Sequence, residues 1–425
     1  MKKTRLFLIL ISVFSIFNSY AQDNCFNHTS YIACYASGYD EYQKIPPPDN
    51  FSRGERTATI NATLTGFNTA DSIAFYFAKN IWEGVLITTV PIKLNAYLLP
   101  LGSGGLLGIT FPNGRKNFSG APVADRWYAT SLANQLAGAE LNVGEADIDL
   151  VLNANNNWYF GTDGNCPVGK YDFVSVVLHE MCHGFGFVGL AKIDSLGVGS
   201  FGELQSSDFM GVSPSFPWPQ LDTFPGIFDH FLVDADTLNL DDTLNYFNPS
   251  LALDTAFTCN NIYWNGSFGI AAANNFMPRI YAPATWALGS SMVHLNEASY
   301  PVGNANELMT PFATSHSSNH NPGPICFGML KDIGWNLDFS SIESAAENNL
   351  VEVFPNPASQ MLLVNCYSLL GKNPTVTIFN LEGKEIETVQ LNSKNEIDVS
   401  SFANGIYFLK INADNGNYFS KFVKD

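Results

Sequence analysis

The stretch DFVSVVLHEMCHGFG, residues 172–186, decides the fold of the middle of this 425-residue chain. Asp172 is a favourable N-cap residue, and the run that follows it is mostly apolar. Gly184 and Gly186 supply a helix stop at the other end. The pattern predicts a largely buried helix over residues 173–185.

Two histidines of this helix are spaced so that they can bind one cation. Residues four apart lie one above the other on a helix, so His179 and His183 present two imidazole rings on the same face. Glu180 is rotated from His179 by about 100° and can reach a water on that cation without being a ligand. The alternative is a buried helix with two hydrogen-bonded histidines, although burying these groups without a partner is unfavourable. The pattern favours a catalytic zinc site.

The residues by themselves leave the third zinc ligand open. Catalytic zinc takes three protein ligands and keeps one position free. The candidates for the third ligand are His230, His294, His316, His320, Glu203 and Glu297.

Two further segments carry a family resemblance together with the helix. GSSMVHL at residues 289–295 and NELMTP at residues 306–311 resemble leishmanolysin-like metzincin zinc peptidases, in which a large insertion separates the helix from the third histidine. A methionine-containing turn then follows. Over roughly residues 60–338, the resemblance implies one catalytic Zn²⁺ held by His179, His183 and His294. It also implies that Glu180 is the general base and that Met309 forms the turn beneath the metal.

Two positions depart from the metzincin pattern. Other metzincins have the third ligand ten residues after the first, and Gly189 stands there in this chain. Some have a tyrosine three residues after the methionine, where this chain has Phe312. The chain therefore has no tyrosine at that place, and the zinc itself would have to polarise the carbonyl group of the substrate.

The residues before the motif helix predict a mixed α/β half-domain. Apolar positions at spacings of three and four predict a helix over residues 71–82, and residues 126–136 predict a second, shorter one. Residues 91–99 are typical of a strand. Residues 146–153 predict another strand, which is either part of the core or a sheet edge that pairs with an extended peptide.

The region after the motif helix predicts a long insertion. Residues 190–289 are rich in glycine, proline and aromatic residues and are expected to be loop-rich. The resemblance therefore implies an α+β metzincin-like catalytic domain over residues 22–341, with a mixed sheet and an active-site helix, followed by a polar linker at 342–350. No aspartate-containing loop has the ligand spacing of a Ca²⁺ site, so calcium has no support.

The N-terminus is typical of an export signal. Lys2, Lys3 and Arg5 precede an apolar run at residues 6–17, and small residues follow. This pattern predicts a signal peptide over residues 1–21. The run is shorter than the roughly 20 residues that a membrane-spanning helix needs, and no later stretch is longer, so no transmembrane segment is expected.

Composition excludes several classes of partner. The chain has 39 acidic against 21 basic residues and a formal net charge of −18, which makes nucleic acid and acidic membrane surfaces poor partners. A hydrophobic fraction of 46% with only 14% charged residues predicts folded domains rather than disorder.

Seven cysteines in an exported chain favour disulfides, with one thiol left over. The pairs suggested by position are Cys25–Cys34, Cys259–Cys326 and Cys166–Cys182. Residues 24–54 could instead be a short pro-segment in which Cys25 or Cys34 caps the zinc, although a disulfide between these two is the favoured reading.

Residues 351–425 predict a small all-β sandwich, because short β-rich runs alternate with turn residues. The segments FPNP at 354–357, IFNLEGK at 378–384 and KFVK at 421–424 resemble the C-terminal sorting domain of type IX secretion substrates. The resemblance implies a Gram-negative cell, contact with the type IX secretion machinery, and export across the outer membrane to the medium or the cell surface. A β-sandwich adhesion module is the alternative.

These patterns predict a secreted zinc endopeptidase that hydrolyses extracellular proteins or peptides through a zinc-activated water, with Glu180 as general base. The alternative is a catalytically silent, zinc-containing protein for surface binding or adhesion. The presence of Glu180 favours the enzyme, because a purely structural zinc site gains nothing from that carboxylate.

Overall fold

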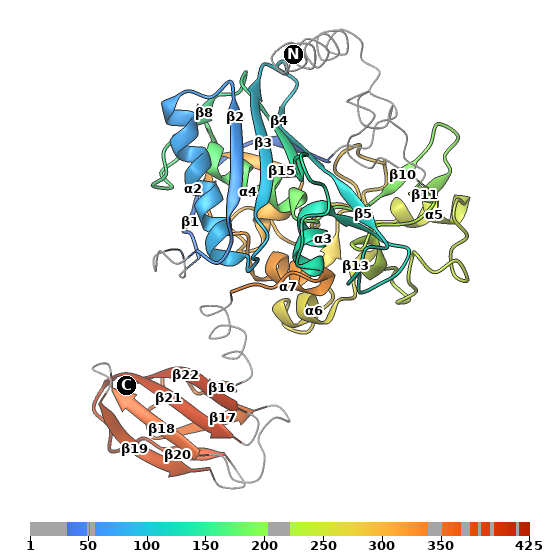
Figure 1. Cartoon of the computed structure of the whole chain (residues 1–425). Helices are drawn as coiled ribbons and strands as arrows, with labels where there is room; N and C mark the ends of the chain where they lie inside the picture. The colour runs from blue at the N-terminus through green and yellow to red at the C-terminus, as the bar shows by residue number, and fades with distance from the viewer. Residues whose placement is uncertain are drawn as a thin grey trace. The chain divides into compact units, whose positions relative to one another are not determined.

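The computed structural model describes residues 32–48, 51, 56–202, 222–338, 351–366, 375–380, 384–391, 395–413 and 416–425 (Figure 1). The chain divides into two compact units, residues 1–338 and 339–425. The predicted signal peptide at 1–21 and the predicted linker at 342–350 lie outside the described residues.

A six-stranded mixed sheet forms the centre of the first unit. Its strands, in spatial order, are β15 (Phe312–Asn319), β1 (Ile32–Ile45), β4 (Leu106–Pro112), β7 (Ile148–Asn153), β3 (Ile92–Leu99) and β2 (Ile60–Thr65). β2, β3 and β7 are parallel, whereas β4 runs antiparallel to β7. β1 is antiparallel to β4 and parallel to β15, so it fills the place between them.

The prediction that the strand after residue 146 could offer a free sheet edge is wrong. β7 lies between β4 and β3 and is hydrogen-bonded on both sides. All but one of its residues are buried, including Ile148, Leu150 and Leu152, as is usual for a strand covered on both faces. The core-strand alternative is the correct one.

Helix α2 (Thr69–Val85) confirms the predicted helix and extends it at both ends. Asn68 is its N-cap and forms a capping box with Asp71: the side chain of each residue accepts a hydrogen bond from the backbone amide of the other. At the start of the helix Ile73 is 58% exposed, whereas Phe75 is fully buried. Near its end, Trp82 Nε1 donates to the Leu178 carbonyl of the motif helix, so the two helices contact each other.

The motif helix is α4 (Phe173–Gly184), and its predicted N-cap is confirmed. Asp172 Oδ1 accepts a hydrogen bond from the Ser175 backbone amide at 2.8 Å. At the other end, a Cβ on Gly184 would lie 2.6 Å from Ile148 Cδ1 of β7. Glycine is therefore required there, because it lets the helix pack closely on the sheet.

The predicted helix over residues 126–136 is shorter than expected. Its first residues form β6 (Trp127–Ala129), which pairs with β5 (Gly114–Lys116). The helix itself, α3 (Thr130–Ala137), begins only after that pairing ends. Ser131 of this helix donates to the Gly184 carbonyl and so fixes the C-terminal end of α4.

The predicted loop-rich insertion contains short elements, and residues 203–221 of it lie outside the described part. These elements are β10 (Ala191–Ile193), β11 (Gly199–Phe201), η3 (Asp229–Phe231), β12 (Leu232–Val233), α5 (Leu251–Phe257), β13 (Ile262–Trp264), α6 (Ser267–Ala272) and β14 (Arg279–Ile280). The helix α7 (Pro324–Ile333) anchors them, because Asp332 accepts hydrogen bonds from Trp264 Nε1 and the backbone amide of Gly269.

The predicted disulfides within the described residues are wrong. Cys34, Cys166, Cys182, Cys259 and Cys326 are all free thiols. The buried Cys326 on α7 has its Sγ 3.3 Å from Cys182 Sγ on α4, whereas Cys259, its expected partner, is exposed. Cys25 lies outside the described residues. The pairs fail because spacing along the chain does not report which helices face each other.

The second unit consists of two sheets around one apolar core. Their strands are β16 (Val351–Phe354), β17 (Met361–Cys366) and β20 (Glu396–Asp398) in one, and β19 (Glu385–Gln390), β18 (Thr375–Asn380), β21 (Gly405–Ala413) and β22 (Gly416–Lys424) in the other. Leu362, Val376, Ile397 and Leu409 are buried between them. The strands lie where the sequence predicts them.

Candidate metal centre

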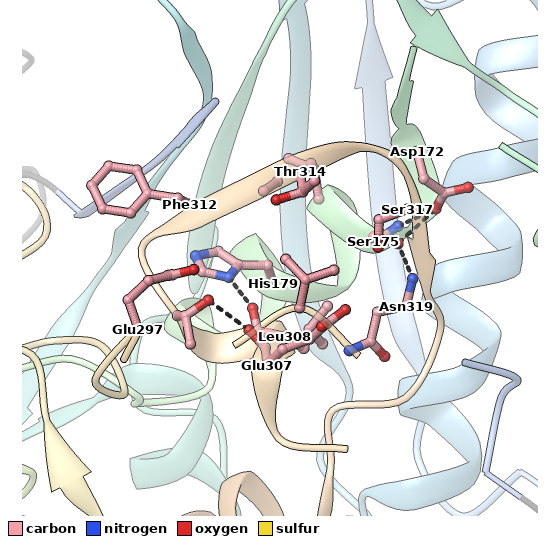
Figure 2. Close-up of a pocket in the computed structure, with 14 residues that line it drawn as sticks. Asp172, Ser175, His179, Glu297, Glu307, Leu308, Phe312, Thr314, Ser317 and Asn319 are labelled. Atoms are coloured by element: carbon pink, nitrogen blue, oxygen red, sulfur yellow. Dashed lines mark hydrogen bonds between the residues drawn. The ribbon is translucent and has the colours of Figure 1, made fainter. Parts of the chain in front are cut away.

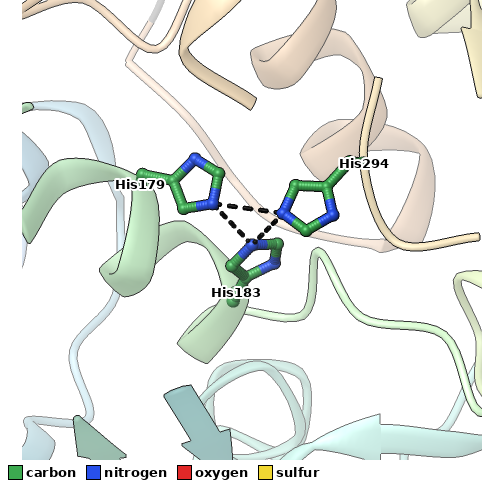
Figure 3. A group of neighbouring side chains, drawn as sticks. All are labelled: His179, His183 and His294. Carbon is green, nitrogen blue, oxygen red and sulfur yellow. Dashed lines mark hydrogen bonds between the residues drawn. The ribbon is translucent and has the colours of Figure 1, made fainter. Parts of the chain in front are cut away.

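Three histidines from two distant segments meet in the first unit (Figure 3). His179 Nε2 lies 3.0 Å from His183 Nε2, and His294 Nε2 lies 3.2 Å from each of them. All three side chains are buried. The structure therefore brings together the three residues that the sequence predicts as metal ligands.

The other ring nitrogens fix the tautomers of these histidines. Each Nδ1 faces a backbone carbonyl oxygen: that of Leu308 at 2.6 Å for His179, Phe187 at 2.7 Å for His183, and Ser290 at 2.8 Å for His294. Each Nδ1 must therefore carry a proton and donate it. The three Nε2 lone pairs then face one another, which is unfavourable without a cation between them.

The donor set fits a zinc ion. Three nitrogens bound at 2.0–2.1 Å to one tetrahedral zinc would lie about 3.3–3.4 Å apart, close to the spacing found here. Burial lowers the pKa of His179 to about 4 and the pKa values of His183 and His294 well below their ordinary range, so the rings are neutral, as ligands must be. The carbonyl acceptors hold the rings in the orientation that a metal site requires.

His294 reaches the centre from the loop that follows β14. The backbone amide of Tyr281 donates to the His294 carbonyl, and the Met292 amide donates back to the Tyr281 carbonyl. The 3₁₀ turn η4 (Glu307–Met309) contacts the segments that carry His179 and His294. Its Leu308 carbonyl accepts a hydrogen bond from His179 Nδ1, and its Met309 carbonyl accepts one from the backbone amide of Leu295, which follows His294. Met309 is fully buried in this turn, and its role beneath a metal stays a prediction.

The structure explains why position 189 is glycine. A Cβ there would lie 2.4 Å from Asp229 Oδ1 and 3.4 Å from the Met292 carbonyl oxygen. Asp229 is itself fully buried and accepts hydrogen bonds from the backbone amides of Leu190 and Gly226, both at 2.8 Å. No side chain fits at position 189 without displacing Asp229.

Glu180 lies beside His179, one of the three histidines, and is fully buried. The Thr110 hydroxyl of β4 lies 2.5 Å from its Oε2, and a Cβ on Gly108 would lie 2.7 Å from its Oε1. Burial raises the pKa of Glu180 to about 8, against the lowering effects of Thr110 and of the Cys34 backbone. No sequence pattern connects Thr110 or Gly108 to Glu180, because the contact depends on how α4 crosses the sheet.

Cys34 of β1 also lies at this centre. Its Sγ, a nitrogen of His179 and a carboxylate oxygen of Glu180 are all within 4.8 Å of one another. The thiol is free and buried, and burial together with the charge of Glu180 raises its pKa well above the ordinary range. The sequence favoured a Cys25–Cys34 disulfide, and a position of Cys34 near the metal was only the alternative.

The other predicted ligand candidates lie elsewhere. His230 Nδ1 is 2.8 Å from Asp241 Oδ2, and His316 is partly exposed, 3.9 Å from Asp40. His320 is buried, and its Nε2 lies 3.0 Å from Oδ1 of Asp172, the N-cap residue of α4. Glu203 lies outside the described residues.

Phe312 has a tyrosine beside it. The rings of Phe312 and Tyr281 meet edge to face with their centroids 6.1 Å apart. Burial and the charge of Glu297 raise the pKa of Tyr281, so its hydroxyl stays protonated. Phe312 stands where some metzincins have a tyrosine, and Tyr281, from another segment, lies beside it.

Comparison with known families matches two parts of the chain. Residues 352–425 match the secretion system C-terminal sorting domain, and residues 123–194, which include α4, match a family described as SPBPB7E8-like. No curated protein matches the chain.

Two solved structures are similar to small parts of the chain. A DUF3244 family protein from Bacteroides vulgatus with an immunoglobulin-like β-sandwich fold has 18% identity and a TM-score of 0.16, covering 18% of this chain and 85% of its own. The BSP domain of a biofilm-associated protein has 16% identity and a TM-score of 0.15, covering 17% of this chain and 14% of its own. Both scores are too low to support an argument.

The match to the sorting domain identifies the localisation of the protein. Within the described part of the chain, no helix has the length and apolarity needed to cross a membrane. The chain is exported across the outer membrane to the cell surface or the medium, and its residues 352–425 are a C-terminal sorting domain of the type IX secretion system.

Proposed function

We propose that the first unit is a zinc-dependent endopeptidase. The observation that carries the proposal is the convergence of three neutral, buried imidazole nitrogens, each oriented by a carbonyl, next to the buried carboxylate of Glu180. Three nitrogen ligands with a fourth position free are typical of catalytic rather than structural zinc. The leishmanolysin-like resemblance of the motif segments agrees with this reaction.

The residues of the chain have distinct roles in the proposed reaction. His179, His183 and His294 would hold the ion, which when bound supplies a Lewis acid and lowers the pKa of a water. Glu180 would take the proton of the attacking water and return it to the leaving amine. The Thr110 hydroxyl holds the Glu180 carboxylate in place between α4 and β4.

β1 supports a proposal for how an extended peptide binds. It pairs antiparallel with β4 and parallel with β15, and its backbone amides at Ala33 and Tyr35 donate to the carbonyls of Gly289 and Pro311. Both neighbours thus offer main-chain hydrogen bonds to a strand that passes the metal centre. A substrate peptide would take the place of β1.

This arrangement makes the described chain latent. β1 fills the slot, and the Cys34 thiol lies within 4.8 Å of a nitrogen of His179 and of a carboxylate oxygen of Glu180, next to the place of the proposed reaction. We propose that the Cys34 thiolate competes for the fourth position of the ion from beside His179, because sulfur is a preferred zinc ligand. Activity therefore requires release of β1.

The proposed activity is tested on the chain cut once between residues 48 and 57, with β1 then removed. We expect hydrolysis of an unfolded protein substrate that stops with 1,10-phenanthroline and returns with added zinc. A chain that keeps one zinc ion and its circular dichroism spectrum but cleaves nothing would support the silent, surface-binding alternative.

The sorting tail gives a prediction of its own. Deleting residues 351–425 should leave the protein in the periplasm, because the export machinery no longer has the domain that it recognises. Immunoblots of periplasm and medium, with a periplasmic marker enzyme as fractionation control, measure this. Normal amounts of the truncated chain in the medium would rule the role out.

A further inference from the structure

A cavity that is partly open to solvent adjoins the metal centre (Figure 2). His179 forms part of its wall, so the cavity begins where the proposed reaction occurs. α4 provides one side, and the segment from residue 297 to 319 provides the other. A side chain of a peptide bound in the slot of β1 could enter it next to the scissile bond.

The lining combines an apolar wall with two carboxylates. Val176, Leu308 and Ala313 present aliphatic surface, whereas Glu297 and Glu307 bring acidic groups (Figure 2). An aliphatic stem with a cationic end matches this combination, because lysine and arginine bury their methylene groups while the charge seeks a partner.

Neither carboxylate has a cationic partner among the residues that the structure describes. No ion pair between described residues includes Glu297 or Glu307. Glu297 Oε2 is inaccessible to solvent and has no hydrogen-bond partner among these residues. Burial raises the pKa of Glu297, and it raises that of Glu307 to about 7, with Glu297 and Glu41 adding to the effect. The cavity thus contains two carboxyl groups without a cationic partner among the described residues, and a cation bound there would favour their charged form.

β1 does not fill the cavity. Where it passes Ala313 and Thr314 of the lining, it presents only Ala36 and Ser37, and Ser37 Oγ lies 2.9 Å from Thr314 Oγ1. Further along, β1 contributes Glu41, whose charge is unfavourable for Glu307. The resident strand therefore lacks the side chain that the cavity is suited to hold.

We propose that this cavity selects a lysine or arginine side chain of the substrate, with Glu297 and Glu307 as the residues that determine the preference. The proposal rests on the proposed peptidase function and names its substrate class: extended peptides with a basic residue beside the cleaved bond.

The first test uses the full, uncut chain and needs no hydrolysis. We expect n-butylammonium to bind and raise the melting temperature, because a ligand that binds only the folded state stabilises it. The neutral analogue 1-pentanol should give no shift. The double variant Glu297→Gln/Glu307→Gln should lose the shift, whereas Glu145→Gln, an exposed carboxylate of the same unit, should keep it.

The second test uses the cut chain and peptides that differ only in lysine, norleucine or glutamate at each position. We expect a 10- to 100-fold higher kcat/KM for lysine than for norleucine at one position, roughly the effect of one hydrogen bond to a charged group. The double glutamine variant should reduce this ratio to near one.

The two tests separate the proposals. Binding of n-butylammonium without any peptide cleavage would leave the cavity assignment standing and overturn the peptidase. Cleavage without a preference for lysine, together with equal effects of the amine and the alcohol, would overturn the cavity assignment and leave the peptidase standing.

Discussion

Glu180→Gln should reduce peptide hydrolysis by the cut chain roughly 10²- to 10⁴-fold, which is the usual contribution of a general base. The amide cannot accept the proton of the attacking water, so the loss falls on kcat rather than on KM. Zinc content should stay at one ion per chain, because the three histidines and their carbonyl acceptors are unchanged. Atomic absorption and steady-state kinetics measure the two quantities.

The control for this variant is its melting temperature, which tests whether it folds as stably as the wild-type chain. Burial raises the pKa of Glu180 to about 8 from an ordinary value of 4.5, so in the metal-free chain the folded state prefers the protonated carboxyl. That preference makes the wild-type chain lose stability as the pH rises from about 4.5 to 8. Metal-free Glu180→Gln should therefore melt no lower than wild type at pH 8. Unchanged turnover in this variant would refute the role of Glu180.

Release of β1 should convert an inactive chain into an active one, with at least roughly a tenfold rise in turnover, because the substrate slot is open in only a small fraction of uncut molecules. The strand holds this place firmly, since Ile32, Ala33 and Cys34 are buried beside β4. Hydrolysis of an unfolded protein by the uncut chain, and by the chain cut between residues 48 and 57 with β1 then removed, measures the change.

A second measurement examines Cys34 without reference to activity. The cobalt-substituted, uncut chain should show a near-ultraviolet thiolate-to-cobalt charge-transfer band. Cys34→Ser should lose the band, whereas Cys259→Ser, at an exposed free cysteine, should keep it. A band that survives Cys34→Ser, or equal activity before and after cutting, would contradict the latency.

The sequence by itself determined the features that depend on neighbours along the chain. Asp172 as N-cap, the helix that follows it, and the placement of His179 and His183 on one face all result from helix geometry, which repeats every few residues. The strands of residues 351–425 and the sorting motifs within them also depend only on residues close together in the sequence. These signals remain readable because they involve no distant partner.

Only the tertiary structure decided which distant segments meet. His294 joins His183 across 111 residues of sequence, and Thr110 reaches Glu180 across 70. Residue spacing also assigned Cys34 to a disulfide, whereas the register of β1 against β4 places its thiol beside His179 and Glu180. Periodicity specifies which face of an element is apolar but not which element covers it, because that is decided by packing among segments far apart in the chain.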